Sequence, residues 1–324
     1  MYRKVYLTED INEKGKSLLR DHGYELSIGT DISAESVLQG ATDCDAILTR
    51  NAVIDKRIIR GCPKLKVISV HGVGVNGVDI PFATSSGIQV TNAARSNQNS
   101  VAEFTIGLIL LLSKHTILYN NELKRGNWSI RKVYGTDLEG KTLGIIGLGR
   151  IGSLVAHKAS GGFGMKVIAY KRNLANAIQQ EHVCLTDNLD EVLSSSDFLT
   201  IHVPSNESTN GMIGERELSL MKSDAYLVNT ARGEVIDEEA LYVALRDHKI
   251  AGAAIDVFTG NVPKIDNPLL YLDNVIVTPH AAAFTQQSLE RMAYQSALGI
   301  VEVLECKEPS YPVNHLVPAT EGVH

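Results

Sequence analysis

The chain has few of the residues that mark specialised classes of protein. It has four cysteines (Cys44, Cys62, Cys184 and Cys306), which are widely separated and form neither a CxxC pair nor a cluster with histidines. This scatter argues against a disulfide framework and against a zinc site, and it favours reduced thiols in a cytosol. We therefore expect a cytoplasmic protein that binds no metal.

Long hydrophobic runs and runs of one charge are also missing. The most apolar stretch, Ile106–Leu112, is far too short to span a bilayer, and the N-terminal MYRKVYLTEDINEKGK has no signal-peptide core. The formal net charge of −6 is mild, and the basic residues form no long run. Neither a membrane nor a nucleic acid is therefore an expected partner.

What is present is the pattern of an α/β protein. The 324 residues suit two domains, and short apolar runs alternate with amphipathic helical stretches, as in proteins with parallel sheets. The expected strands are Lys4–Thr8, Ala46–Thr49, Leu65–Val70 and Gln89–Thr91, and then Thr142–Gly147, Lys166–Tyr170, Phe198–Val203, Ala225–Thr230, Gly252–Val257 and Val275–Thr278.

Three helices are expected at particular places. One covers Glu13–His22, and another follows Ala281 and runs to about Glu305. Between them, a long helix is expected over Ser100–Arg125, with Glu103 placed three residues after Ser100 as in a capping box. Its density of Leu and Ile exceeds one stripe, which predicts burial on several sides, at a domain junction or a subunit interface.

A glycine-rich turn follows the strand Thr142–Gly147 and opens a helical stretch. The turn reads Gly147-Leu148-Gly149-Arg150-Ile151-Gly152, a GxGxxG pattern in the strand–turn–helix context that dinucleotide binding requires. The first glycine permits the tight turn, the second lets the backbone approach a pyrophosphate, and the third lets helix and strand pack closely. We expect the helix N-terminus to bind the phosphates of a dinucleotide.

The end of the next strand bears on the choice of dinucleotide. An acidic residue there would bind a free ribose 2′-hydroxyl, but Lys166–Tyr170 runs into Lys171 and Arg172. Two cations suit a 2′-phosphate, although they could also be solvated surface residues. The sequence therefore favours NADP(H) and leaves NAD(H) possible.

Polar residues stand just beyond four of the expected strands. His202 follows Phe198–Ile201, Arg232 follows Tyr226–Thr230, Asp256 ends Gly252–Ile255, and His280 follows Val275–Pro279. Ligands of an open parallel sheet bind beyond the carboxyl ends of its strands, so these residues should share one edge with the phosphate turn. A histidine that donates a proton and an arginine that binds a carboxylate suit reduction of a 2-keto acid.

Several long motifs follow one another over nearly the whole chain: HGVGVNGVD, NSVAE, LEGKTLGIIGLGRIG, FGMKVIAY, IHVP, LVNTARGEVIDEEAL, AGAAIDVF and LDNVIVTPH. Through these motifs the chain resembles the D-isomer-specific 2-hydroxyacid dehydrogenases, a family that includes phosphoglycerate dehydrogenase, glyoxylate/hydroxypyruvate reductase and D-lactate dehydrogenase. The resemblance implies two Rossmann-like domains with doubly wound parallel sheets. The substrate domain would be discontinuous, with residues 1–98 and 282–324, and the NAD(P)-binding domain would comprise 99–281.

The resemblance also implies roles for single residues. Arg232 would be the catalytic arginine and His280 the acid/base, and the backbone N–H groups of Val73 and Gly74 would hold the substrate carboxylate. Asp256 would contact the nicotinamide carboxamide. The other implied cofactor contacts, besides the turn 147–152 with Lys171 and Arg172, are His202, Val203, Pro204, Thr209, Thr230, Ala231 and His280. The long helix after Asn99 would lie at the interface of a homodimer.

One departure from the family pattern concerns the histidine's partner. Five residues after Asp256, where the family has a glutamate, this chain has Asn261. An amide accepts a hydrogen bond from imidazole but carries no charge to stabilise imidazolium, so a lower histidine pKa and an acid-shifted activity profile are expected. Two alternatives stay open: a formate-dehydrogenase-like enzyme, whose histidine has an amide partner, and a non-catalytic nucleotide-sensing or corepressor-like protein.

Overall fold

The chain folds into two compact units, each built on a parallel sheet. The computed structural model describes residues 3–174, 180–260 and 262–316. One unit combines Met1–Asn97 with Phe284–His324, and the other is the continuous segment Gln98–Ala283. The predicted α/β class is confirmed. The roles predicted for the two parts, in substrate and cofactor binding, stay predictions.

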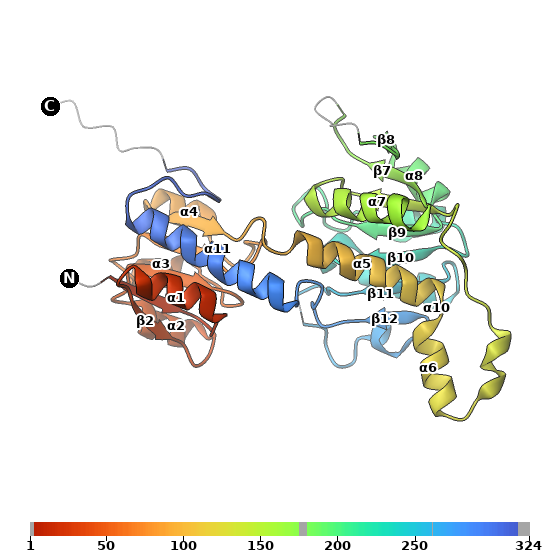
Figure 1. Ribbon diagram of the computed structural model, residues 1–324, viewed down its shortest axis with the longest axis horizontal. Helices are drawn as coiled ribbons and strands as arrows, with labels where there is room; N and C mark the ends of the chain where they lie inside the picture. The colour runs from red at the N-terminus through yellow and green to blue at the C-terminus, as the bar shows by residue number, and fades with distance from the viewer. Residues whose placement is uncertain (1–2, 175–179, 261, 317–324) are drawn as a thin grey trace. The chain divides into compact units, whose positions relative to one another are not determined.

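The first unit has a five-stranded sheet in the order β2-β1-β3-β4-β5, and all of its strand pairs are parallel. Its helices α1 and α11 lie side by side (Figure 1). Tyr6 and Ile47 face one hydrophobic cluster, and Val5 and Leu7 face another that includes Ala293. Both faces are therefore covered, as parallel sheets require. Its elements are β1 Lys4–Leu7, α1 Glu13–Asp21, β2 Glu25–Ile28, α2 Ala34–Ala41, β3 Ala46–Thr49, α3 Lys56–Gly61, β4 Val67–Val70, α4 Ile80–Ser85, β5 Gln89–Asn92 and α11 Gln286–Leu304.

The second unit has a seven-stranded parallel sheet in the order β12-β11-β10-β9-β6-β7-β8. Leu143 and Ile145 of β6 pack with α5 and α7, whereas Ile146 packs on the opposite face. Its elements are α5 Gln98–Ser113, α6 Thr116–Lys124, η1 Trp128–Lys132, β6 Thr142–Ile146, α7 Arg150–Phe163, β7 Lys166–Tyr170, β8 Val183–Thr186, α8 Leu189–Ser195, β9 Phe198–Ile201, α9 Glu215–Leu220, β10 Tyr226–Asn229, η2 Gly233–Val235, α10 Glu238–Arg246, β11 Gly252–Ile255, η3 Pro268–Tyr271 and β12 Val275–Val277.

The single long helix expected over Ser100–Arg125 is wrong. The chain forms α5 and α6, which meet at an angle of 58°. His115, between them, has a left-handed backbone (φ 51°), and the carbonyl oxygen of Ser113 accepts the N–H of Thr136 at 2.7 Å. A segment distant in sequence thus supplies the donor for a backbone carbonyl at the C-terminal end of α5, and no local sequence signal predicts this bond.

The capping box is wrong as well, because α5 begins at Gln98 and Ser100 therefore lies inside its first turn. The Glu103 carboxylate accepts instead from Asn99 Nδ2 at 2.6 Å. Burial of α5 on several sides is confirmed, since nine of its residues are buried. Among the described residues, no single helix is long and apolar enough to cross a membrane. α5 and α6 pass that test only as a bent pair.

The strands β2 and β8 and the helices α2, α3 and α4 were not identified from the sequence. Both missed strands are edge strands, and β2 has no buried residue, so its apolar pattern is weak. Several predicted strands end one or two residues early in the structure, although the residue after the strand can still bond the neighbouring strand, as the N–H of Thr8 does to the Leu48 carbonyl at 2.9 Å.

Within the first unit, Asn314 ties the C-terminal segment to α4 and β5. Its Oδ1 accepts from the backbone N–H of Val90 at 2.6 Å and from Gln89 Nε2 at 2.8 Å. Its Nδ2 donates to Thr84 Oγ1 and to the carbonyl of Ile88, both at 2.9 Å. The side chain is buried, so each of these bonds is shielded from water.

We predict that Asn314→Ala destabilises the protein by about 2–4 kcal/mol, because it removes the side-chain partner of the Val90 N–H and of the Ile88 carbonyl and breaks the bonds to Gln89 and Thr84. Denaturant unfolding measures the loss. The control is His315→Ala, a change at the exposed neighbouring residue, which should alter stability by less than about 0.5 kcal/mol. Equal effects of the two variants would contradict this account of Asn314.

Candidate functional site

The carboxyl ends of five adjacent strands bring the predicted residues of the second unit to one edge of its sheet. Gly147 follows β6, His202 follows β9, Arg232 lies beyond β10, Asp256 follows β11 and His280 lies beyond β12. These strands are neighbours in the order β12-β11-β10-β9-β6, and all of their pairings are parallel. The placement expected from the strand ends is therefore the one observed, while the roles of the residues stay predictions.

The glycine-rich turn has the backbone that its sequence pattern requires. Gly147 has φ 100°, and a Cβ there would lie 2.8 Å from Val203 Cγ1, so a side chain is excluded. A Cβ at Gly152 would collide with the carbonyl oxygen of Gly147, so α7 packs closely on the turn. Gly149 is the N-cap of α7 and has open space where a side chain would be. A ligand phosphate can approach the first N–H groups of α7 there.

The two cations expected near a 2′-phosphate stand at the end of β7, next to β6. Arg172 Nη2 donates to Ser208 Oγ at 3.0 Å and to the Ser208 carbonyl at 3.3 Å. The backbone N–H of Lys171 donates to the carbonyl of Thr186 at 2.9 Å. The Arg172 guanidinium is thus held on the loop that follows β9.

Thr209 and Thr230 are predicted cofactor contacts, and the hydroxyl of each forms hydrogen bonds within the protein. Thr209 Oγ1 donates to the Pro204 carbonyl at 2.6 Å and accepts from the Asn206 N–H at 2.9 Å. Thr230 Oγ1 hydrogen-bonds Thr105 Oγ1 of α5 at 3.0 Å. These contacts shape the loops beyond β9 and β10.

Burial separates the two histidines of this edge. Desolvation lowers the pKa of His202 to about 3, which favours the neutral imidazole near pH 7, and its Nε2 lies 3.1 Å from Thr200 Oγ1. The pKa of His280 is also lowered, by partial burial first and by the nearby Arg232 charge second, while the Asp256 carboxylate opposes the shift. The pKa of His280 is therefore lower than that of a solvated histidine.

Asp256 holds the segment that carries His280. Its carboxylate, 1% exposed, accepts from Thr278 Oγ1 at 2.6 Å and from the N–H groups of Ala281 at 2.8 Å and Ala282 at 3.0 Å. The backbone N–H of His280 also donates to the Asp256 carbonyl at 2.8 Å. The expected contact of Asp256 with a nicotinamide stays a prediction. The structure adds that both carboxylate oxygens bind this segment.

The Arg232 guanidinium is largely buried, and desolvation lowers its pKa while Glu234 opposes the shift. Its Nη1 donates to the Ala231 carbonyl at 2.6 Å. The N–H of Ala231 in turn donates to Asn229 Oδ1 at 3.0 Å, and Asn229 Nδ2 donates to the Arg232 carbonyl at 2.8 Å. The arginine thus stands on a turn fixed from within. Asn261, the predicted partner of His280, lies outside the described residues.

Val73 and Gly74, the residues predicted to hold a carboxylate, belong to the first unit and follow β4. The Val73 carbonyl accepts from Asn92 Nδ2 at 2.8 Å, which ties the turn to the end of β5. Sequence reasoning missed His71, which directly precedes this turn. The sequence does contain a signal for it: His71 is a polar residue directly after the buried strand β4, just as the other candidate residues follow their strands.

His71 is 5% exposed, and neither ring nitrogen has a hydrogen-bond partner among the described residues. Desolvation, and then the charge of Arg50, lower its pKa to about 4. In the folded protein the imidazole of His71 is therefore neutral down to about pH 4. In the unfolded chain the same side chain has the ordinary histidine pKa of about 6.5.

We predict that stability falls as the pH drops from about 6.5 to about 4, by about 3 kcal/mol, because only the unfolded chain takes up this proton. His71→Phe should flatten that part of the stability–pH curve, measured by denaturant unfolding. The exposed-site control, His315→Phe, should leave the curve as it is. A curve that stays steep in His71→Phe would rule out His71 as its cause.

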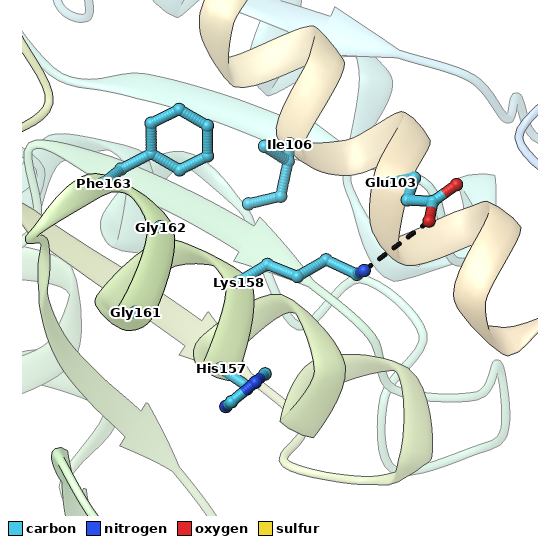
Figure 2. A pocket seen from close by; sticks show the side chains of 7 residues that line it. All are labelled: Glu103, Ile106, His157, Lys158, Gly161, Gly162 and Phe163. Carbon is cyan, nitrogen blue, oxygen red and sulfur yellow. Dashed lines mark ion pairs between the residues drawn. The ribbon is translucent and has the colours of Figure 1, made fainter.

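A surface groove lies apart from these residues, between α5 and α7 (Figure 2). Lys158 of α7 forms an ion pair with Glu103 of α5 across it, with Nζ and Oε1 3.6 Å apart. The groove is lined by Glu103, Ile106, His157, Lys158, Gly161, Gly162 and Phe163. No residue of the predicted cofactor or substrate set lines it.

Comparison with known proteins places the chain among relatives. Residues 106–282 match the family model described as D-isomer specific 2-hydroxyacid dehydrogenase, NAD binding domain. The chain is 40% identical to D-3-phosphoglycerate dehydrogenase of Methanocaldococcus jannaschii over 94% of its own length and 57% of that protein. It is 35% identical to glyoxylate reductase of Korarchaeum cryptofilum over 98% of its own length and 97% of that protein. The chain thus spans little more than half of the length of this phosphoglycerate dehydrogenase from Methanocaldococcus jannaschii.

Among solved structures, one similar protein is an NADPH-dependent glyoxylate/hydroxypyruvate reductase of Sinorhizobium meliloti, crystallised with NADP and malonate. The TM-score is 0.86 and the identity 27%, with 97% of each chain covered.

Proposed function

We propose, since the chain belongs to the D-isomer specific 2-hydroxyacid dehydrogenase family, that it moves a hydride between a nicotinamide dinucleotide and C2 of a small 2-keto or 2-hydroxy acid. The observation that carries this proposal is the shared strand edge. Arg232, Asp256 and His280 lie at the ends of three adjacent strands, on the same edge as the glycine turn after β6.

The glycine turn fits a dinucleotide, because Gly149 leaves space for a pyrophosphate at the N-terminus of α7. When bound, the reduced nicotinamide supplies the hydride. This chain's residues supply the rest. The Arg232 guanidinium binds the substrate's carboxylate and polarises its carbonyl oxygen, and His280 gives that oxygen a proton as C2 is reduced. The N–H groups of Val73 and Gly74 bind the carboxylate.

Asp256 has three proposed parts in this reaction. It contacts the nicotinamide carboxamide, as the family pattern implies, and it fixes the backbone that carries His280. The negative charge of Asp256 also raises the pKa of His280, against burial and Arg232. Asn261 is the proposed hydrogen-bond partner of His280, in place of the family's glutamate.

Protonated His280 is the form that can give a proton to the carbonyl oxygen of the keto acid. Because the pKa of His280 is lowered, kcat/KM for reduction should fall as the pH rises through a value below 6.5. Asn261→Glu should move that limb to higher pH by about one unit, because a carboxylate stabilises imidazolium. Initial rates over a range of pH measure this.

The matched control is Gln287→Glu, the same amide-to-carboxylate change at an exposed position of α11, which should leave the limb in place. An unmoved limb in Asn261→Glu would count against Asn261 as the partner of His280.

For the cofactor we favour NADP(H), with NAD(H) as the alternative. Lys171 and Arg172 follow β7 and supply positive charge for a 2′-phosphate, and Ser208 holds the Arg172 guanidinium in place. Arg172→Ala should therefore lower kcat/KM for NADPH by about tenfold or more and leave that for NADH within about twofold. An exposed arginine elsewhere, changed in Arg246→Ala, is the control. Equal losses with both cofactors would contradict the 2′-phosphate assignment.

We further propose a homodimer in the cytosol. Helix α6 has no buried residue, although Ile117, Leu118 and Leu123 belong to it, and the following segment exposes Trp128 and Tyr134. An apolar surface of this kind is typical of a subunit interface. The four cysteines are free, as suits a reducing compartment.

The function is tested by following the absorbance of NADPH, and separately of NADH, with glyoxylate, hydroxypyruvate, 3-phosphohydroxypyruvate and branched 2-keto acids. Turnover with one of them supports the proposal and identifies the substrate. Oxidation of formate alone would favour the formate-dehydrogenase-like alternative. Cofactor binding without turnover would favour the nucleotide-sensing or corepressor-like alternative, which keeps the fold without the chemistry.

A further inference from the structure

Glu238, outside the residues assigned above, holds both ends of the loop that leaves the site after β11. It is the first residue of α10. Its Oε1 accepts the backbone N–H of Thr259 at 2.5 Å, and its Oε2 accepts from Asn267 Nδ2 at 3.0 Å. Asn267 Oδ1 in turn accepts the N–H of Leu269 and so begins η3. One carboxylate therefore anchors the loop where it starts and where it ends.

The same loop is joined to the turn that carries Arg232. Gly233 follows this arginine, and a Cβ there would collide with the backbone of Phe258 and Thr259. One residue further along each segment, Glu234 Oε1 accepts the N–H of Gly260 at 3.4 Å. The backbone after Asp256 thus runs directly against the backbone after Arg232.

Glu238 is not needed to begin its own helix. Asp237 is the N-cap of α10, and its Oδ1 accepts the N–H groups of Glu239 at 3.0 Å and Ala240 at 3.1 Å. Glu239 also places a negative charge in the first turn, which suits the helix dipole as well as Glu238 does. The two hydrogen bonds to the loop are therefore the distinctive contribution of the Glu238 carboxylate.

We propose that Glu238 is a positioning residue for the reaction. Its carboxylate bonds Thr259 and Asn267, and it acts through the segment that starts at Asp256 and in which Asn261 stands. The bonds to Thr259 and Asn267 keep this segment in register with the Arg232 turn. Asp256 then stays where its carboxylate can hold the segment of His280 and raise the pKa of that histidine. This inference rests on the proposed dehydrogenase function.

The test compares Glu238→Gln and Glu238→Ala with Glu239→Gln and Glu239→Ala, which make the same changes at the exposed next residue. Misplacement of catalytic groups by a fraction of an ångström lowers turnover steeply, so kcat with the best 2-keto acid should fall about tenfold or more in the Glu238 variants. The KM for reduced cofactor should stay within about twofold. The Glu239 variants should keep wild-type kinetics.

The pH profile distinguishes positioning from a general loss of stability. With Asp256 less well held, the pKa of His280 should fall further, and the limb of kcat/KM for reduction should move to lower pH in the Glu238 variants. A structural defect alone would lower the amount of folded enzyme and leave the limb where it is. Glu238→Gln keeps one oxygen that can accept the N–H of Thr259. This variant replaces Glu238→Ala in the test if Glu238→Ala does not fold.

Hydrogen exchange gives a readout that needs no activity. The Thr259 amide should exchange faster in Glu238→Ala than in Glu239→Ala, because only the first variant removes its acceptor. Faster exchange with unchanged kcat and an unmoved limb would overturn the positioning role, and so would losses shared by the Glu238 and Glu239 variants. No turnover by the wild-type enzyme with any keto acid would instead refute the function on which the inference rests.

Discussion

The Asp256 carboxylate is the interaction on which the geometry of this edge depends. His280 has a left-handed backbone with φ 54°, a conformation that costs a non-glycine residue about 1–2 kcal/mol. Three hydrogen bonds from Thr278, Ala281 and Ala282 to one buried carboxylate hold the chain in this shape. Without them the histidine segment would relax, and the proposed proton donor would leave the end of β12.

The electrostatics of the site follow from burial and from Arg232. The same guanidinium that suits a substrate carboxylate also lowers the pKa of His280, and Asp256 offsets only part of that effect. Asn261 stands where the family pattern has a glutamate, so no carboxylate at that position stabilises the protonated form of His280. Arg232, the proposed substrate-binding group, thus stands near a histidine whose pKa is lowered, and the proposed reduction should be favoured at acidic rather than alkaline pH.

The sequence predicted the strands of the second unit, except β8, to within one or two residues at their ends, because buried parallel strands are short apolar runs. Polar residues follow several of these runs. That rule placed Arg232, Asp256 and His280 on one edge, and it would have found His71 in the first unit. It could not predict the break at His115, since the partner of Ser113 is Thr136, more than twenty positions away. Nor could it show that Glu238 bonds Thr259, a contact made only by folding.

The most direct test of hydride transfer at this edge uses reduced cofactor deuterated at C4 of the nicotinamide. We predict that the wild-type enzyme places the deuterium on C2 of the hydroxy acid formed from its keto-acid substrate, as mass spectrometry of the product would show. Arg232→Ala and His280→Gln should form almost no labelled product while still binding the cofactor. Labelled product formed at the wild-type rate by both variants would contradict the assignment of the chemistry to these residues.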